Sequence, residues 1–394
     1  MKNIWRNIHL WLGLAAGLIF FVECLSGTLL VFEDEITFML YKNRYEVVSG
    51  SQPRINLDDL LFKVRKNHPE ETIGQVKVYK DLNRTTEVNL SLKQKNKKGE
   101  AKDKKVEEGG GRKRNRGYTL FVDPYTGKET GRLNPEKPTF FSLMLKIHQT
   151  LLAGDIGKSI LGISTFMVFT ILITGLVLWF PKKRKQLKAK VTLKVGAGWK
   201  RLNHDLHIVL GFYCTFFLLI ILITSLAWSF KWANKALYTF TGSKPSEFKT
   251  YKSISPIEKE NKITYQQALE IGQSKFANTD YWSISMPKSE EQTISVSSVN
   301  KDALHRNGFD NLSLDQRTGA VINSTLLKDM PGGWQLRRYM KPIHTGAIGG
   351  FSTKLLAFLV SLISASFPIT GTILWLNRIK KKKKGVSKEK LAHA

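Results

Sequence analysis

The chain has 394 residues and a formal net charge of +29 at pH 7, from 61 Lys and Arg against 32 Asp and Glu. Such an excess is common in nucleic-acid-binding proteins, but here the basic residues lie in short segments beside apolar stretches, which argues against a nucleic-acid partner. The two cysteines, Cys24 and Cys214, both lie in apolar stretches, so a disulfide framework is excluded.

Four apolar segments, nearly free of charge, have the length of about 20 residues that a helix needs to cross a bilayer. They are residues 10–32, 159–180, 208–230 and 354–376. The first is too long for the apolar region of a signal peptide and lacks a small-residue cleavage site, so we interpret it as a retained helix. The sequence therefore predicts an α-helical integral membrane protein with a four-helix transmembrane bundle.

Basic residues gather at three places on one side of a chain that spans four times. They precede the first span, fill the loop between the second and third, and follow the fourth. Because Lys and Arg are enriched in cytoplasmic loops, we expect both termini in the cytoplasm and the two long loops on the outer side. These clusters are also expected to contact the anionic head groups of the lipid bilayer.

The predicted organisation, in chain order, alternates spans with soluble segments. It comprises a first span (1–32), a first outer domain (33–147), an interfacial segment with the second span (148–180), a basic cytoplasmic loop (181–206), a third span (207–230), a second outer domain (231–343), an interfacial segment with the fourth span (344–376) and a basic cytoplasmic tail (377–394). The loop at 181–206 has no room for a nucleotide-binding or flavin-binding domain.

Both outer domains show the periodicities of a small α+β module. In the first, helix periodicity covers 57–67 and strand alternation covers 74–79, 86–92 and 118–122, whereas the Lys-rich stretch 93–116 is expected to be a flexible hairpin tip. In the second, a helix is expected at 265–276, strands at 282–286 and 293–298, and a strand and turn at 312–319 that resemble residues 120–127.

Histidine spacing repeats between the two halves of the chain. His9 lies 17 and 18 residues before a Ser-Gly pair, and His207 lies the same distances before a Thr-Ser pair. His148 and His344 each lie 26 and 27 residues before a Thr-Gly pair, and 31 residues before a tryptophan. We therefore predict two tandem copies of a unit made of a helix, an outer module and a helix. The other four histidines have no counterpart: His68, His204, His305 and His393.

The repeated histidines form two pairs at opposite ends of the spans. His9 and His207 start spans one and three on the cytoplasmic side, whereas His148 and His344 precede spans two and four on the outer side. Neutral imidazoles that face each other from neighbouring helices are suited to ligate haem iron. We predict two haems, one for each pair. The alternative is a structural histidine that was copied by duplication.

Three further residues belong to the predicted site. Gly13 and Gly211 each follow an inner histidine by four residues, so they share its helical face and leave room for a flat ring; ordinary packing of small residues between helices is the alternative. His204, three residues before His207, is the rival for the inner ligand. Zinc fits less well, because no Cys, Asp or Glu recurs beside the histidines.

At these residues the sequence resembles the PepSY-associated transmembrane helix family, and most of all its ferric-siderophore reductase branch. The resemblance covers nearly the whole chain and rests on five features: Ile8-His9-Leu10-Trp11-Leu12-Gly13, Leu206-His207-Ile208-Val209-Leu210-Gly211, Val122-Asp123-Pro124-Tyr125-Thr126-Gly127, Ile343-His344-Thr345-Gly346, and the Thr-Gly…Leu-Trp helix ends. It implies a bacterial inner-membrane protein with periplasmic PepSY-like domains and haem b. The chain departs from the pattern at Ser225, where the first half has Gly27, and in the apparent insertion at 93–116.

The expected function is that of a di-haem membrane reductase for periplasmic ferric iron, with a ferric siderophore or another Fe(III) chelate as substrate. The electron donor has to be external, a quinol or a cytoplasmic flavin or nicotinamide reductase, because the sequence has no Gly-rich nucleotide loop. No catalytic residue is assigned beyond the haem. Two alternatives are a non-enzymatic, membrane-anchored regulator of a peptidase and an accessory subunit of a siderophore or metal transporter. Against the transporter stands the absence of any sign of broken helices.

Overall fold

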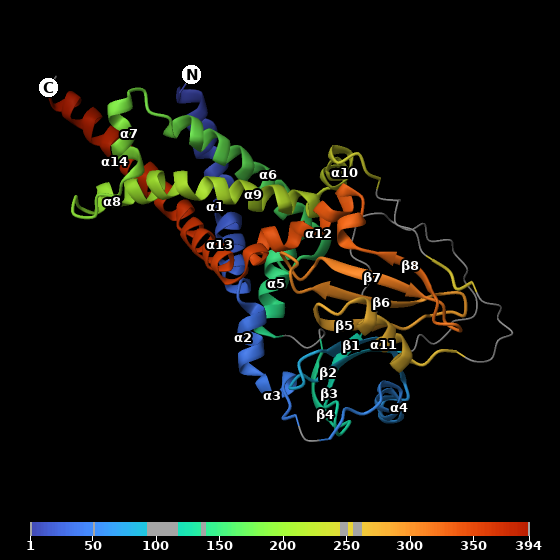
Figure 1. The fold of residues 1–394 in the computed structure, drawn as a ribbon. Helices are drawn as coiled ribbons and strands as arrows, with labels where there is room; N and C mark the ends of the chain where they lie inside the picture. Colours follow the sequence, from blue (N-terminus) through green and yellow to red (C-terminus); the bar gives the residue numbers. More distant parts are fainter. Residues whose placement is uncertain are drawn as a thin grey trace, which may run out of the picture. The chain divides into compact units, whose positions relative to one another are not determined.

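The computed structural model describes residues 2–49, 52–92, 117–134, 139–244, 251–254 and 262–392. The chain forms two compact units (Figure 1). The helical unit contains residues 1–33, 139–236 and 340–394, and the sheet unit contains residues 34–138 and 237–339.

The helical unit holds the four expected spans. Its elements are α1 (Lys2–Leu30), α5 (Phe140–Thr150), α6 (Gly154–Trp179), α7 (Leu187–Val191), α8 (Trp199–Asp205), a π-helical turn (Leu206–Leu210), α9 (Gly211–Ser229), α13 (Gly350–Ala365) and α14 (Phe367–Ala392). Four stretches are long and apolar enough to cross a membrane: Lys2–Leu30, Gly154–Trp179, Trp199–Ser229 and Ala347–Lys381. The prediction of four membrane helices is confirmed at this level of length and composition.

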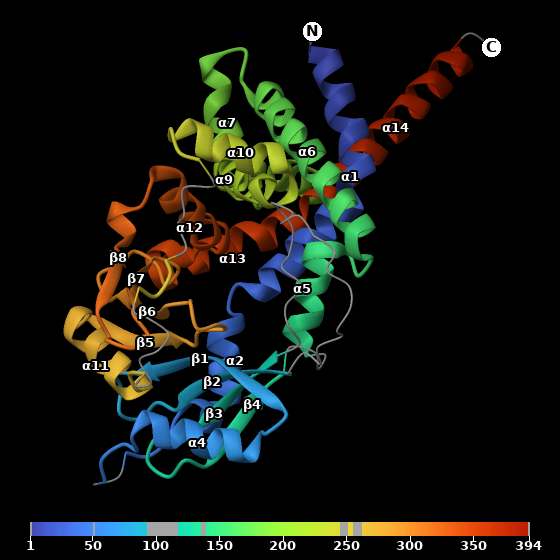
Figure 2. The same cartoon turned by 90° about the vertical axis from the view of Figure 1, so that its right-hand side faces the viewer.

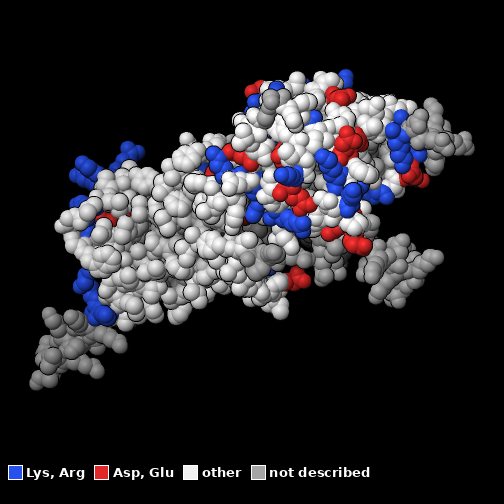
Figure 3. Space-filling model, turned by 90° about the horizontal axis from the view of Figure 1, so that it is seen from below, with Lys and Arg blue, Asp and Glu red and all other residues white. Residues whose placement is uncertain are grey.

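Helix α1 packs against α6, α13 and α14, and α9 packs against α6 and α13 (Figures 1 and 2). Small and aliphatic side chains such as Ala16, Val168 and Leu218 form the shared core. Apolar side chains also cover the outside of the helices; Leu18, for example, is 76% exposed. Figure 3 shows a broad surface without charged side chains over this unit. A lipid bilayer would cover such a surface, because contiguous apolar patches of this extent are costly in water.

The fourth span is interrupted, which corrects the expectation of unbroken helices. Helix α13 ends at Ala365, and α14 begins at Phe367 after the single residue Ser366. Pro368 explains the interruption, since proline lacks an N–H and its ring clashes with the preceding helical turn. The interruption lies close to Thr370, which contacts one of the histidines described below.

Sharp turns follow both outer histidines. After α5 the chain turns through Leu151 and Leu152, which have positive φ values of 48° and 61°. At Gly157, a Cβ would lie 1.7 Å from the backbone oxygen of Thr150, so only glycine permits this close approach of α5 to α6. The second turn uses Gly346, with φ of 75°, a conformation that glycine adopts without strain.

The sheet unit is one eight-stranded antiparallel sheet with two helices, and two more short helices lead into it. Its elements are α2 (Glu33–Leu40), α3 (Lys42–Tyr45), α4 (Leu57–Asn67), β1 (Glu71–Tyr79), β2 (Thr86–Leu92), β3 (Gly117–Val122), β4 (Glu129–Leu133), α11 (Tyr265–Lys275), β5 (Thr279–Ser285), β6 (Ile294–Asn300), β7 (Phe309–Leu314) and β8 (Val321–Thr325). Helices α10 (Lys231–Phe240) and α12 (Gly332–Thr345) contain residues of both units.

The strand order β4-β3-β2-β1-β5-β6-β7-β8 is symmetric about its centre. There β1 pairs with β5, so that Val76 lies opposite Ile284 and Val78 opposite Trp282. Alternate strand residues point to the same side of a sheet, and these four are buried in one core with α4 and α11. The two outer modules expected from the sequence therefore share a single sheet and a single core.

Most predicted elements of the sheet unit are present, and α4 and β2 have the predicted bounds. The pattern missed the edge strands β4 and β8, which are short and mostly polar. An edge strand buries little, so its sequence lacks clear alternation. The expected flexible tip at 93–116 lies outside the described residues.

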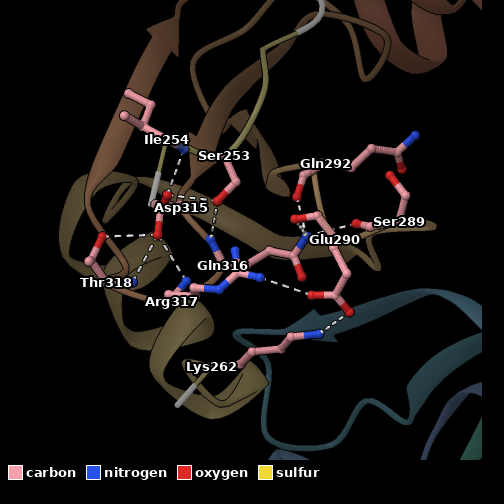
Figure 4. Close-up of polar contacts among 10 residues, drawn as sticks. All are labelled: Ser253, Ile254, Lys262, Ser289, Glu290, Gln292, Asp315, Gln316, Arg317 and Thr318. Atoms are coloured by element: carbon pink, nitrogen blue, oxygen red, sulfur yellow. Dashed lines mark hydrogen bonds and ion pairs between the residues drawn. The ribbon is translucent and has the colours of Figure 1, made fainter. Parts of the chain in front are cut away.

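Matching aspartate turns precede the two edge strands. Asp123 accepts hydrogen bonds from the backbone N–H of Tyr125 (2.8 Å) and Thr126 (3.4 Å). Asp315 does the same for Arg317 and Thr318, both at 2.9 Å. Asp315 is almost fully buried, and it also holds a second segment of the chain (Figure 4): its Oδ2 accepts from the Ser253 hydroxyl (2.7 Å) and from the N–H of Ile254 (2.9 Å).

We expect Asp315→Ala to destabilise the sheet unit by about 3 kcal/mol, because it leaves several buried donors without their charged acceptor. The matched variant Asp123→Ala removes only the local turn and should cost about 1 kcal/mol. Thermal unfolding of the two purified full-length variants measures the difference. Equal effects of the two substitutions would show that the bonds to Ser253 and Ile254 contribute nothing.

Candidate functional site

The structure brings the four repeated histidines together as two pairs. The ring centres of His9 and His207 are 6.3 Å apart, and those of His148 and His344 are 6.1 Å apart. With a metal–nitrogen bond of about 2 Å on each side, two imidazoles on one metal ion hold their ring centres about 6 Å apart. Both pairs therefore have the spacing of two axial ligands.

The pairs are built by different elements at opposite ends of the spans. His9 lies on α1 and His207 on the π-helical turn before α9, whereas His148 and His344 lie in the last turns of α5 and α12. His148 contacts Ser26 near the end of α1. The 17 residues from His9 to Ser26 correspond to about 25 Å of helix, close to the thickness of a bilayer's hydrocarbon core.

Each imidazole is hydrogen-bonded through Nδ1 to a Ser or Thr hydroxyl of a neighbouring span. The four bonds are His9 to Thr174 (3.0 Å), His148 to Ser26 (3.2 Å), His207 to Thr370 (2.9 Å) and His344 to Thr224 (3.0 Å). The arrangement is reciprocal within each half of the chain. The histidine of α1 is held by α6 and the one just before α6 is held by α1; the second half relates α9 and α14 in the same way.

These contacts determine the tautomer of the rings. Nδ1 also lies 3.0–3.2 Å from a backbone carbonyl in three cases: Ile171 for His9, Glu23 for His148 and Ile221 for His344. A carbonyl can only accept, so Nδ1 carries the proton. For His207 the same follows because the Thr370 hydroxyl donates to carbonyls of its own helix. Each neutral ring is therefore left with an unprotonated Nε2, the nitrogen available to a metal.

The outer pair lies in surroundings that favour neutral rings. Burial lowers the pKa of His148, and burial together with the neighbouring His148 lowers the pKa of His344 to about 4. Both rings are therefore uncharged near pH 7, as metal ligation requires. Among the described residues, no hydrogen bond occupies Nε2 of any of the four histidines.

Glycines form a close floor under three of the four rings. A Cβ at Gly27 would lie 3.1 Å from Cε1 of His148, and one at Gly175 would lie 3.3 Å from Cε1 of His9. A Cβ at Gly371 would lie 3.1 Å from Cε1 of His207. The glycine beside each hydroxyl thus allows the imidazole to lie against the helix backbone.

Gly13 and Gly211, which the sequence assigned to the cofactor face, have a different environment. A Cβ at either position would meet no protein atom within 4 Å. The space beside both glycines is therefore open, and each lies one helical turn from an inner histidine. This is compatible with a flat ring against both helices.

The unmatched histidines of the described residues lie outside the pairs. His204 bonds through Nδ1 to Asp205 (3.1 Å) and is substantially exposed. His68 and His305 both lie in the sheet unit, where His68 bonds to Glu129 (2.7 Å). The geometry thus favours His207 over His204 as the partner of His9.

Two observations test whether this site fits a haem. No group of three or more His, Cys, Asp and Glu among the described residues could hold a metal ion, but a haem iron takes only two axial protein ligands because the porphyrin supplies the others. In addition, Nε of Arg6, one turn before His9, is buried and has no hydrogen-bond partner within the described part of the chain. A haem propionate is an acceptor of the kind that this guanidinium lacks. The donor set and the open cradle both fit.

Ser26, Thr174, Thr224 and Thr370 are functional residues that the sequence pattern contained but did not assign. Their spacing from the histidines defined the repeat, yet no sequence rule linked a hydroxyl to a histidine in another span. The signal was the occurrence of a hydroxyl residue at the same position in all four spans.

Four membrane-length helices, an antiparallel sheet unit and paired histidines define a membrane protein with a PepSY-like domain. The chain belongs to the family described as the PepSY-associated TM region, which matches residues 6–378. The resemblance inferred from the sequence is therefore confirmed. A comparison with curated proteins finds no match.

Proposed function

We propose that this protein is a di-haem b reductase of the bacterial inner membrane, which passes electrons to periplasmic ferric iron, with a ferric siderophore as the substrate class. The observation that carries the proposal is the presence of two histidine pairs with ring centres 6.3 and 6.1 Å apart. Bound haem would supply the one-electron redox chemistry. An external quinol or cytoplasmic reductase would supply the electrons.

The side chains have distinct roles in this proposal. His9 and His207 hold the inner group, and His148 and His344 hold the outer group. The Ser and Thr hydroxyls orient the rings and make Nε2 a better ligand by accepting the Nδ1 proton in a hydrogen bond. The apolar core between the pairs excludes water from the path between them.

The orientation in the membrane and the tandem duplication are also part of the proposal. The N-terminus, the loop that carries α7 and the C-terminal part of α14 lie at the same end of the helical unit (Figures 1 and 2). The basic clusters lie in these segments, so the positive-inside rule supports a cytoplasmic position for this end. The reciprocal contacts within each half and the symmetric strand order support duplication.

The decisive experiment is a visible spectrum of the detergent-purified protein from haem-replete cells. We expect a Soret band that shifts on reduction with dithionite, and about two haems per chain by pyridine haemochrome assay. Addition of a ferric siderophore to the reduced protein should then restore the oxidised spectrum. A colourless protein would contradict the proposal and favour a regulator without a cofactor.

A further inference from the structure

One of the four histidine sites differs from the other three. His9, His148 and His207 each lie over a glycine next to the hydroxyl that holds Nδ1. Beside Thr224, which holds His344, the chain has Ser225 instead. The site of His344 is thus the only one of the four with a side chain at this position.

The other sites show what this side chain does to the space. At the equivalent glycines a Cβ would lie 3.1–3.3 Å from Cε1 of the histidine, which is closer than carbon atoms normally approach. An imidazole over Ser225 cannot occupy the same position and has to shift or rotate. On the same helix, Trp228 packs edge-on against His344 with ring centres 5.0 Å apart, which limits how the ring can move.

The ring angles differ in the same sense. The imidazoles of His9 and His207 are perpendicular, at 90°, whereas those of His148 and His344 are inclined at 61°. The pair that contains the ring over Ser225 is the one that departs from the perpendicular. The hydroxyl of Ser225 does not cause this by bonding to the ring, because it donates to the Leu222 carbonyl (2.9 Å).

We propose that the Cβ of Ser225 sets the tilt of His344 and thereby makes the outer haem electronically different from the inner one. This rests on the proposed function. Each axial imidazole interacts with the iron d orbital perpendicular to its own plane. Perpendicular rings therefore leave two d orbitals nearly equal in energy, and rings closer to parallel separate them. Ligand orientation is one of the means by which a protein tunes a haem.

Electron paramagnetic resonance of the oxidised protein tests this directly. The wild type should give two low-spin ferric signals, the inner one with the larger maximum g value. Ser225→Gly should move the outer signal towards the inner one. Ser225→Ala retains the Cβ and should give the wild-type spectrum. The reciprocal change Gly371→Ser should lower the maximum g value of the inner signal.

Ser229→Gly is the matched control, because it makes the same chemical change one turn further along α9. It should leave both signals in place. A Ser225→Gly spectrum that superimposes on the wild type would overturn the inference, and so would a shift in Ser225→Ala equal to that in Ser225→Gly. A wild type that contains no haem would instead contradict the proposed function, so the two failures are distinguishable.

Discussion

Replacement of His148 by glycine is expected to lower the bound haem from two per chain to one, and to slow the reduction of a ferric siderophore at least about 100-fold. The variant removes one of the two ring nitrogens of the outer pair, and His344 alone lies on the other side. Haem stoichiometry and the rate of siderophore reduction measure the effect. Because the inner pair is untouched, the remaining haem should keep its reduced and oxidised bands.

Rescue and a matched variant make this test specific. Free imidazole added to His148→Gly should restore part of the second haem, since it can occupy the vacated space and coordinate through the same type of nitrogen. His204→Ala should retain two haems, because His204 is bonded to Asp205 and lies outside both pairs. Two haems in His148→Gly without added imidazole would rule out the outer pair as a haem site.

The second large effect is expected at Gly371. Even a Cβ at this position would lie 3.1 Å from Cε1 of His207, so Gly371→Val should displace the ring and remove the inner haem. The outer signal in the visible and paramagnetic spectra should remain. The expected loss is close to one haem per chain, measured by pyridine haemochrome assay.

Two other glycines separate steric damage to the protein from damage to the cofactor site. Gly196 and Gly211 both have open space where a Cβ would be placed. Gly196→Val, in the cytoplasmic loop, should retain both haems. Gly211→Val should lose the inner haem although it displaces no protein atom, because the porphyrin is expected to use the space next to Gly211. Full haem content in Gly211→Val would remove this glycine from the site.

Much of the architecture could be predicted because it depends on local properties of the sequence. The length of each apolar stretch defined the spans, and helical periodicity gave α4 with its bounds. The equal spacing of His9 and His207 from their hydroxyl residues selected the matched histidines. The edge strands β4 and β8 were missed because they bury few residues, and the break before Pro368 because a proline alone does not tell whether a membrane helix bends.

By itself, then, the sequence determined the four spans, the position of the basic segments and which histidines are equivalent. Only the tertiary structure decided that His9 faces His207, that each ring is held by a hydroxyl on another span, and that the two outer modules share one sheet. These are contacts between residues far apart in the chain, and they depend on how helices and strands pack. Spacing along one helix fixes a face, but the partner of that face is chosen by packing.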